Sequence, residues 1–269
     1  MFIKLFSIEW TRLTRRSLFW ISLAVCAVFT WLGLENFYTL NQSQLLSGTL
    51  KMPGFSFDLA NSLDQVFLVA LPFLVIISAV MLGNDYSQRT NQHWLMRASR
   101  PTSLLAKFAL LALFALLVNI LTVLVGGATG WYYKTFIYQT FSLANVNWPA
   151  ALAAPFYMTL TSLPYLALML LITVATRSAF AGAAIGLGYT QFVELLMGGI
   201  FYGMHWTKWM PRSLYLSATY LLNSIGNRTV TWRPEYVLAP IPAFITAALY
   251  TLIFLAAALW LYRRQDLGG

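Results

Sequence analysis

Long apolar runs separated by short polar stretches dominate the pattern of this chain. A helix needs about 20 consecutive apolar residues to cross the hydrocarbon core of a bilayer. We therefore predict an all-α integral membrane fold with a single transmembrane domain over residues 1–269. Its six spans cover residues about 17–35, 63–84, 105–132, 150–176, 178–203 and 237–262.

The first 16 residues follow a different pattern, with apolar and basic side chains on opposite sides of a helical wheel. The apolar face carries Phe2, Ile3, Phe6, Trp10 and Leu13, and the other side carries Lys4, Arg12 and Arg15. A basic helix with aromatic residues on one face is typical of the membrane interface. We predict such an amphipathic interfacial helix ahead of the six spans. An ordinary positively charged flank is the alternative.

The first apolar run could also belong to a cleaved signal peptide. The segment after it lacks a small-x-small cleavage site, and 16 amphipathic residues precede it. We therefore expect the run to be retained as the first span.

The polar connections between the runs differ in length. Glu35–Asn61 contains Pro, Gly and many Asn, Gln and Ser residues, which is typical of a loop. Residues 204–236 form the longest connection, which we expect to be extracellular with short helices. Arg177 and Ser178 leave almost no loop, so the fourth and fifth helices should be antiparallel neighbours.

On the fifth run, small residues recur at helical spacing and predict a close packing face.

Composition and charge agree with this topology. The 269 residues are 59% hydrophobic and 9% charged, against about 25% charged residues in soluble domains. Six spans place both termini on one side. Eleven of the 17 Lys and Arg residues share that side, which makes it cytoplasmic. The net charge of +9 therefore reflects topology rather than nucleic-acid binding.

The sequence contains no recognisable catalytic or nucleotide-binding motif. It lacks the Gly-rich phosphate-binding patterns, and it has no His-Glu-x-x-His. His93 and His205 fall on opposite membrane faces in the predicted topology, and Cys26 is the only cysteine. We expect neither an enzyme nor a resident metal or cofactor.

Glu194 is the one acidic residue well inside a predicted span. A carboxylate at the bilayer centre costs roughly 2.5–3.5 kcal/mol on insertion scales. Glu194 is therefore a candidate residue of a proton or substrate pathway, as in a stand-alone secondary transporter. A structural position near the outer leaflet, bonded to Gln191 or to the outer loop, is the alternative.

A polar, basic segment lies between the second and third spans, at residues 85–103. Trp94, Leu95 and Met96 interrupt its polar residues, and apolar side chains in a water-facing loop suggest a contact surface. Ser99-Arg100-Pro101 has the pattern of a helix start. We predict a short surface helix over Tyr86–Met96.

This arrangement resembles the permease subunits of type-2 ABC exporters. The residues that carry the resemblance are Asp85, Arg89-Thr90, Trp94-Leu95-Met96, Ser99-Arg100 and Lys107, together with the long outer connection before the last span. Arg89 precedes Thr90 where the family often has a glycine, which affects the expected turn geometry.

The resemblance implies a permease whose motor is a separate ATP-binding subunit, present in two copies and holding ATP and Mg²⁺. The residues expected to contact it are Asp85, Arg89, Thr90, Trp94, Leu95, Arg97, Arg100 and Arg177. A second copy or a homologous permease would complete the exporter in a bacterial plasma membrane. The class suggests an amphipathic or hydrophobic cargo such as a peptide antibiotic, a lipid or a drug.

Overall fold

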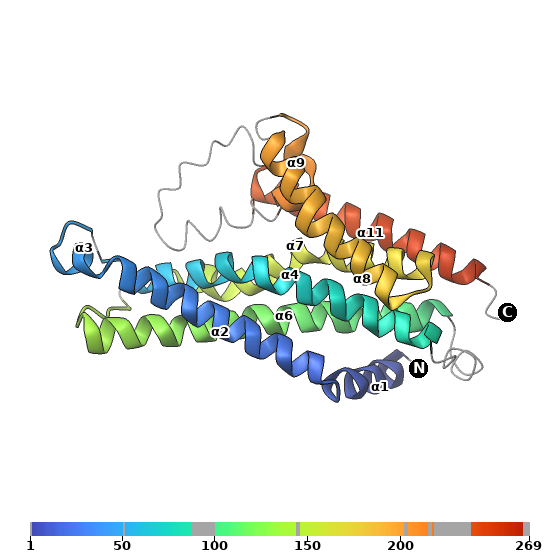
Figure 1. Ribbon diagram of the computed structural model, residues 1–269, viewed down its shortest axis with the longest axis horizontal. Coiled ribbons are helices and arrows are strands. Elements are labelled where there is room, and N and C mark those ends of the chain that lie inside the picture. The colour runs from blue at the N-terminus through green and yellow to red at the C-terminus, as the bar shows by residue number, and fades with distance from the viewer. Residues whose placement is uncertain are drawn as a thin grey trace.

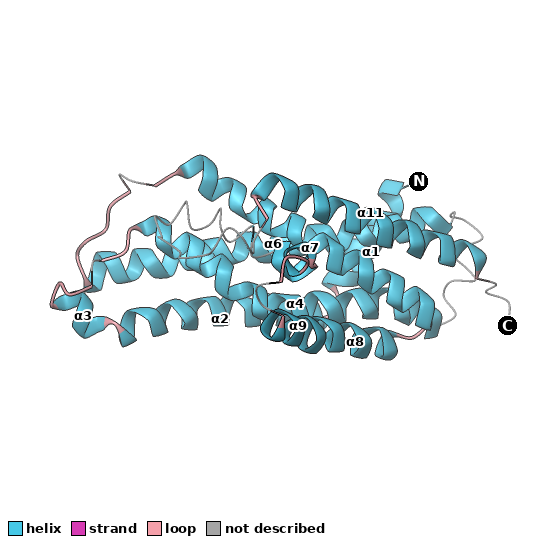
Figure 2. Ribbon diagram, turned by 90° about the horizontal axis from the view of Figure 1, so that it is seen from above, coloured by secondary structure: helices cyan, strands magenta, loops and turns pink. Residues whose placement is uncertain are grey.

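The computed structural model describes residues 2–50, 52–87, 100–143, 146–201, 204–214, 217 and 238–265. Within these ranges all regular secondary structure is helical. The long helices run roughly along the longest axis of the molecule and form one bundle (Figures 1 and 2).

The helices follow the order of the apolar runs. The long ones are α2 (Ser17–Leu40), α4 (Phe55–Ser87), α6 (Arg100–Tyr132), α7 (Trp148–Thr176) and α11 (Pro240–Arg264). The shorter ones are α1 (Phe2–Thr14), α3 (Gln42–Leu46), α8 (Ala179–Leu187) and α9 (Glu194–Ile200), with a 3₁₀ turn at Thr207–Trp209. π-Helical turns at Tyr133–Ile137 and Gly188–Val193 extend α6 and join α8 to α9.

Five helices of the described part are long and apolar enough to cross a membrane. They cover Ser17–Leu40, Val69–Tyr86, Pro101–Ile137, Ala151–Thr176 and Pro240–Arg264. Ala179–Val193, inside the predicted fifth span, is a shorter apolar helix. The chain is therefore a multi-pass membrane protein, and its sixth span stays a prediction.

The predicted loop over Glu35–Asn61 is wrong at both of its ends. Helix α2 continues to Leu40, and α4 begins at Phe55. Some of the polar residues that suggested a loop are buried in the start of α4, namely Ser56, Asp58 and Asn61, and the Tyr38 hydroxyl of α2 donates a hydrogen bond of 2.6 Å to Asp58 Oδ1. Others, such as Asn36 and Gln42, are exposed.

A buried ion pair closes the same end of the bundle. The Lys134 ammonium bonds to the Asp58 carboxylate and donates to the Gly54 carbonyl at 3.0 Å. Lys134 lies in the π-helical turn after α6, so the helical structure continues beyond residue 132, where the third span was predicted to end. Tyr38, Asp58 and Lys134 thus link the ends of α2, α4 and α6.

Helix α4 packs against α2, α6, α7 and α8, and α11 packs chiefly against α7. A core of buried apolar side chains joins α4, α6 and α7 and reaches Leu13 of α1 and Phe19 of α2. The small residues of α8 lie inside the chain: Gly182 faces Thr173 and Gly186 faces Met169. The predicted close packing face thus serves contacts of α8 with α7 and α4.

Candidate functional site

The sequence-predicted contact residues that the structure describes gather at one end of the bundle. Figure 1 shows α1, the end of α4, the start of α6, the α7–α8 turn and the end of α11 on this side. The segment at 88–99, which joins α4 to α6, lies outside the described residues. The site is therefore built from the helix ends that flank this segment.

Lys107 is the centre of the site, on the second turn of α6. Its side chain is 0% exposed, and its ammonium lies 2.8 Å from Glu9 Oε1 and 2.8 Å from Asp85 Oδ2. It also donates to the Met81 carbonyl at 3.4 Å. A fully buried ammonium is stable only when it is paired and hydrogen-bonded, and these contacts satisfy that requirement.

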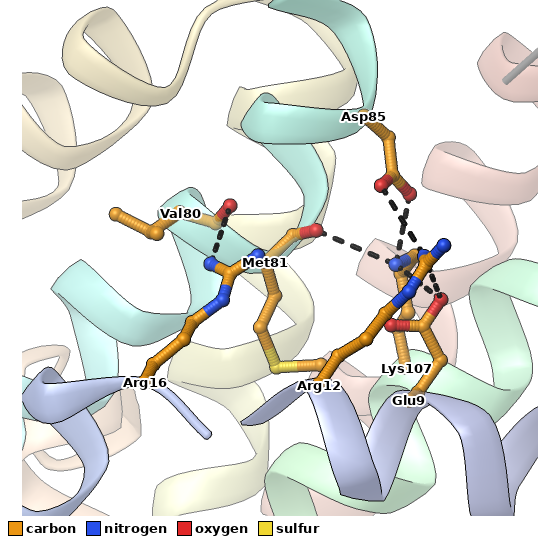
Figure 3. Close-up of polar contacts among 7 residues, drawn as sticks. All are labelled: Glu9, Arg12, Arg16, Val80, Met81, Asp85 and Lys107. Carbon is orange, nitrogen blue, oxygen red and sulfur yellow. Dashed lines mark hydrogen bonds and ion pairs between the residues drawn. The ribbon is translucent and has the colours of Figure 1, made fainter. Parts of the chain in front are cut away.

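Arg12 completes the cluster from the same helix as Glu9. Its guanidinium lies 3.5 Å from Glu9 Oε1 and 4.0 Å from Asp85 Oδ1. Figure 3 shows the four side chains converging from α1, α4 and α6. Two carboxylates face two cations, so the cluster is formally neutral, and each helix contributes at least one charge.

Helix α1 is tied to the bundle by packing as well as by charge. Leu13 is buried, and Phe6 and Trp10 pack against the main core. Beyond its C-terminus, Arg16 donates to the Val80 carbonyl of α4 at 3.4 Å. Much of the apolar face predicted to meet lipid thus covers the bundle. The exposed remainder is at Phe2 and Ile3, while Lys4 and Arg15 expose their charges.

The predicted contact residues have different positions. Asp85 lies in the last turn of α4 and not in a loop, because its carboxylate is held by Lys107. Arg100 begins α6. Arg177 is exposed between α7 and α8, and its φ of 53° gives the sharp turn that makes these helices neighbours. Arg89, Thr90, Trp94, Leu95 and Arg97 lie outside the described residues, as does most of the predicted Tyr86–Met96 helix.

Glu9 is the member of the cluster that sequence analysis missed. It is the only acidic residue before Glu35 and lies three positions before Arg12 in the amphipathic helix. A carboxylate at the border of an apolar helix face suggests that it has a partner, because acidic residues are almost never fully buried unless they are paired. Its partner Lys107 was identified by resemblance, but 98 positions separate the two residues.

Glu194 lies apart from this cluster, at the start of α9. Its side chain is 1% exposed, and the Tyr165 hydroxyl of α7 donates to Glu194 Oε2 at 2.5 Å. Tyr189 and Arg212 also lie near enough to act on the carboxylate. Among the described residues, Glu194 Oε1 has no hydrogen-bond partner. The predicted bond to the outer connection therefore has some basis in Arg212.

The described ranges contain no group of three or more His, Cys, Asp or Glu side chains that could hold a metal ion. The cluster around Lys107 is a set of ion pairs between helices. It links three helices through buried charges at the point where α4 and α6 approach their shared connection.

Comparison with known families agrees with the predicted class. A family model described as ABC-2 family transporter protein matches residues 5–193, which is more than half of the chain. The match includes α1 from residue 5 onward, the whole cluster around Lys107 and the α7–α8 turn. No curated protein matches the chain.

Proposed function

The chain belongs to the ABC-2 transporter family, and from this premise we propose that it is the membrane-spanning subunit of an ATP-driven exporter. A separate ATP-binding subunit, in two copies, would supply the motor and hold ATP and Mg²⁺. Two permeases, either identical or homologous, would enclose the transport path. Both termini would lie in the cytoplasm of a bacterial cell.

The observation that carries this proposal is the cluster around Lys107. Asp85 and Lys107 tie the two helix ends on either side of the 88–99 segment, and Glu9 adds α1 to the same unit. A displacement of that segment by a docked motor would move three helices together. An exporter needs such a rigid element to shift a two-state membrane assembly.

The charges around the cluster suit a motor with an acidic docking surface. Glu9 and Asp85 are occupied by Lys107 and Arg12, whereas Arg15 and Arg177 are exposed at the same end of the bundle. The exposed cations add to those of the 88–99 segment, Arg89 and Arg97. An acidic surface on the motor would complement the exposed charges of Arg15 and Arg177.

Purification with the co-expressed ATP-binding protein tests the partner directly. We expect the wild-type permease to retain that protein in detergent. Charge reversal by Arg89→Glu or Arg97→Glu should uncouple ATP hydrolysis from transport while the permease still folds. Lys208→Glu, in the outer connection, is the matched control and should leave coupling intact. Wild-type coupling in both cytoplasmic variants would contradict the proposed contact.

A stand-alone secondary transporter is the second candidate, and buried Glu194 is the observation that favours it. The carboxylate at the start of α9 accepts a hydrogen bond from Tyr165 of α7, and no described residue meets the hydrogen-bond criteria at its Oε1. This candidate requires transport without an ATP-binding subunit and loss of transport in Glu194→Gln. Unchanged transport in that variant would exclude the pathway role of Glu194.

Family membership supports a proposal for the class of cargo. We propose an amphipathic or hydrophobic molecule, since the long apolar helices and their aromatic residues would line a lipid-like route. Mass spectrometry of molecules retained by the purified permease complex would identify the cargo. Recovery of only small, highly charged metabolites would contradict the proposed class.

A further inference from the structure

Gln265 connects two helix ends that the sequence keeps far apart. It follows α11 directly, and it is 9% exposed. Its Nε2 donates to the Val174 carbonyl at 2.6 Å, and its Oε1 accepts from the Tyr86 hydroxyl at 2.8 Å. Both ends of the side-chain amide are therefore engaged, one with α7 and the other with α4.

The bond to Val174 completes the end of α7. The last four carbonyls of a helix lack donors from the helix itself. The Arg177 backbone amide donates a hydrogen bond of 2.9 Å to the Thr173 carbonyl, and Gln265 Nε2 donates to the Val174 carbonyl. Gln265 thus fixes the final turn of α7 just before Arg177, the exposed residue of the α7–α8 turn.

The bond from Tyr86 fixes the end of α4. Tyr86 is the next-to-last residue of that helix and adjoins the 88–99 segment. Its ring also meets the Tyr262 ring of α11 edge-on, with 6.5 Å between centroids. One turn earlier, Gly83 lies so close to Ala179 at the start of α8 that a methyl group would not fit. The end of α4 therefore packs directly beside the α7–α8 turn.

We infer that Gln265 is a positioning residue that holds the Arg177 turn in a fixed relation to the end of α4. This role rests on the proposed function, in which the 88–99 segment and the Arg177 turn both meet the motor. Tyr86, Gln265 and Val174 form one chain of hydrogen bonds. Movement of the end of α4 is therefore passed to the Arg177 turn. Only a side chain with a donor and an acceptor can make both bonds, so neither leucine nor glutamate can replace glutamine.

The first experiment measures hydrogen–deuterium exchange in the purified permease without a motor. Tyr86→Phe removes one hydroxyl from α4, and Gln265→Leu removes both bonds. In each variant we expect exchange in the peptide over residues 174–182 to rise about two- to ten-fold, as for the loss of one net hydrogen bond. Gln265→Glu keeps the acceptor for Tyr86 and loses the donor to Val174, so it should raise exchange similarly. Tyr132→Phe, an exposed tyrosine at the other end of α6, should leave the peptide unchanged.

A merely local capping role gives a different result. If Gln265 only completes α7, Gln265→Leu will raise exchange at the turn while Tyr86→Phe matches the wild type. That outcome would overturn the inference, because the turn would then be independent of α4.

The second experiment uses the complex copurified with its ATP-binding subunit, with and without ATP plus vanadate. In the wild type we expect nucleotide to change exchange both at the end of α4 and across residues 174–182. In Tyr86→Phe the change at α4 should persist and the change at the turn should be lost. If nucleotide still changed exchange at the turn in Tyr86→Phe, the coupling role would be overturned. This would hold even if the first experiment showed that Gln265 connects the end of α4 to the turn.

Failure of the proposed function has its own signature. A wild-type permease that retains no ATP-binding subunit would overturn that function and the coupling role with it. The exchange of residues 174–182 in the isolated variants would still decide whether Gln265 ties the two helix ends.

Discussion

Lys107 and Glu9 are 98 positions apart in the chain, yet the Lys107 ammonium lies 2.8 Å from Glu9 Oε1. This pair joins α1 to α6, and Asp85 adds α4 to the same buried cation. The N-terminal helix is thus part of the bundle at the end that we propose for motor docking.

Removal of Lys107 should be the most damaging single change in this cluster. Lys107→Met preserves much of the side-chain length, and among the described cations it leaves Glu9 and Asp85 with the more distant Arg12. Breaking a buried pair costs about 3–5 kcal/mol, because the remaining charge is uncompensated. An SDS titration in mixed micelles would measure the loss of unfolding free energy.

Two further variants serve as controls for the Lys107 cluster. Lys4→Met, at an exposed position of α1, should change stability by less than about 0.5 kcal/mol. Adding Glu9→Gln to Lys107→Met should recover part of the loss, because one buried charge is removed. Strict additivity of the two changes would show that the pair does not interact.

The ion pair at the opposite end should behave as a coupled unit as well. Lys134→Met leaves the buried Asp58 carboxylate with the Tyr38 hydroxyl and should cost about 3–5 kcal/mol. Combining it with Asp58→Asn should return more than half of that loss. The same SDS titration measures both variants, and equal stability of Lys134→Met and the wild type would contradict the buried pair.

Gly130 should not tolerate a side chain, because its position on α6 lies directly against the Asp58 carboxyl. We expect Gly130→Ala to destabilise the fold by about 1–3 kcal/mol through overpacking. Gly188 is the matched control, since no atom lies within 4 Å of the position that an added methyl group would take. Gly188→Ala should be neutral or stabilising by up to about 1 kcal/mol. Thermal melts in detergent would rank the two variants, and equal midpoints would contradict the close approach.

Arg177 combines an exposed charge with a strained backbone at φ 53°. Arg177→Gly should match or exceed wild-type stability, by up to about 1 kcal/mol, because glycine adopts this conformation readily. Arg177→Ala removes the charge but retains the strain. If the charge serves the motor, both variants should reduce ATP-driven transport alike, and Arg177→Lys should retain it. Normal transport in the Ala and Gly variants would restrict Arg177 to a role in the turn.

Hydropathy predicts most of the helical segments of this chain but not all of their ends. The apolar runs have a minimum length set by the bilayer, so α2, α4, α6, α7 and α11 follow from hydropathy. Hydropathy did not place Tyr38 and Asp58 in helices, because polar residues that bond to each other inside a bundle have the composition of a loop.

Only some residues of the candidate site could be predicted from the sequence. Asp85 and Lys107 carried the family resemblance, and Arg177 was evident from the shortness of its turn. Glu9 and Gln265 were not identified, because nothing in the local pattern says which helix a buried carboxylate or a terminal amide will meet. Those contacts depend on how the helices pack.

The sequence by itself determined that this chain is a helical membrane protein, because the length and apolarity of its runs admit few other structures. The pattern around Asp85 and Lys107 added the resemblance to the ABC-2 family. Tertiary structure alone decided how the helix ends are joined. Lys107 gathers α1, α4 and α6, and Gln265 joins α4 to α7, since buried charges and amides must find partners wherever packing brings helix ends together.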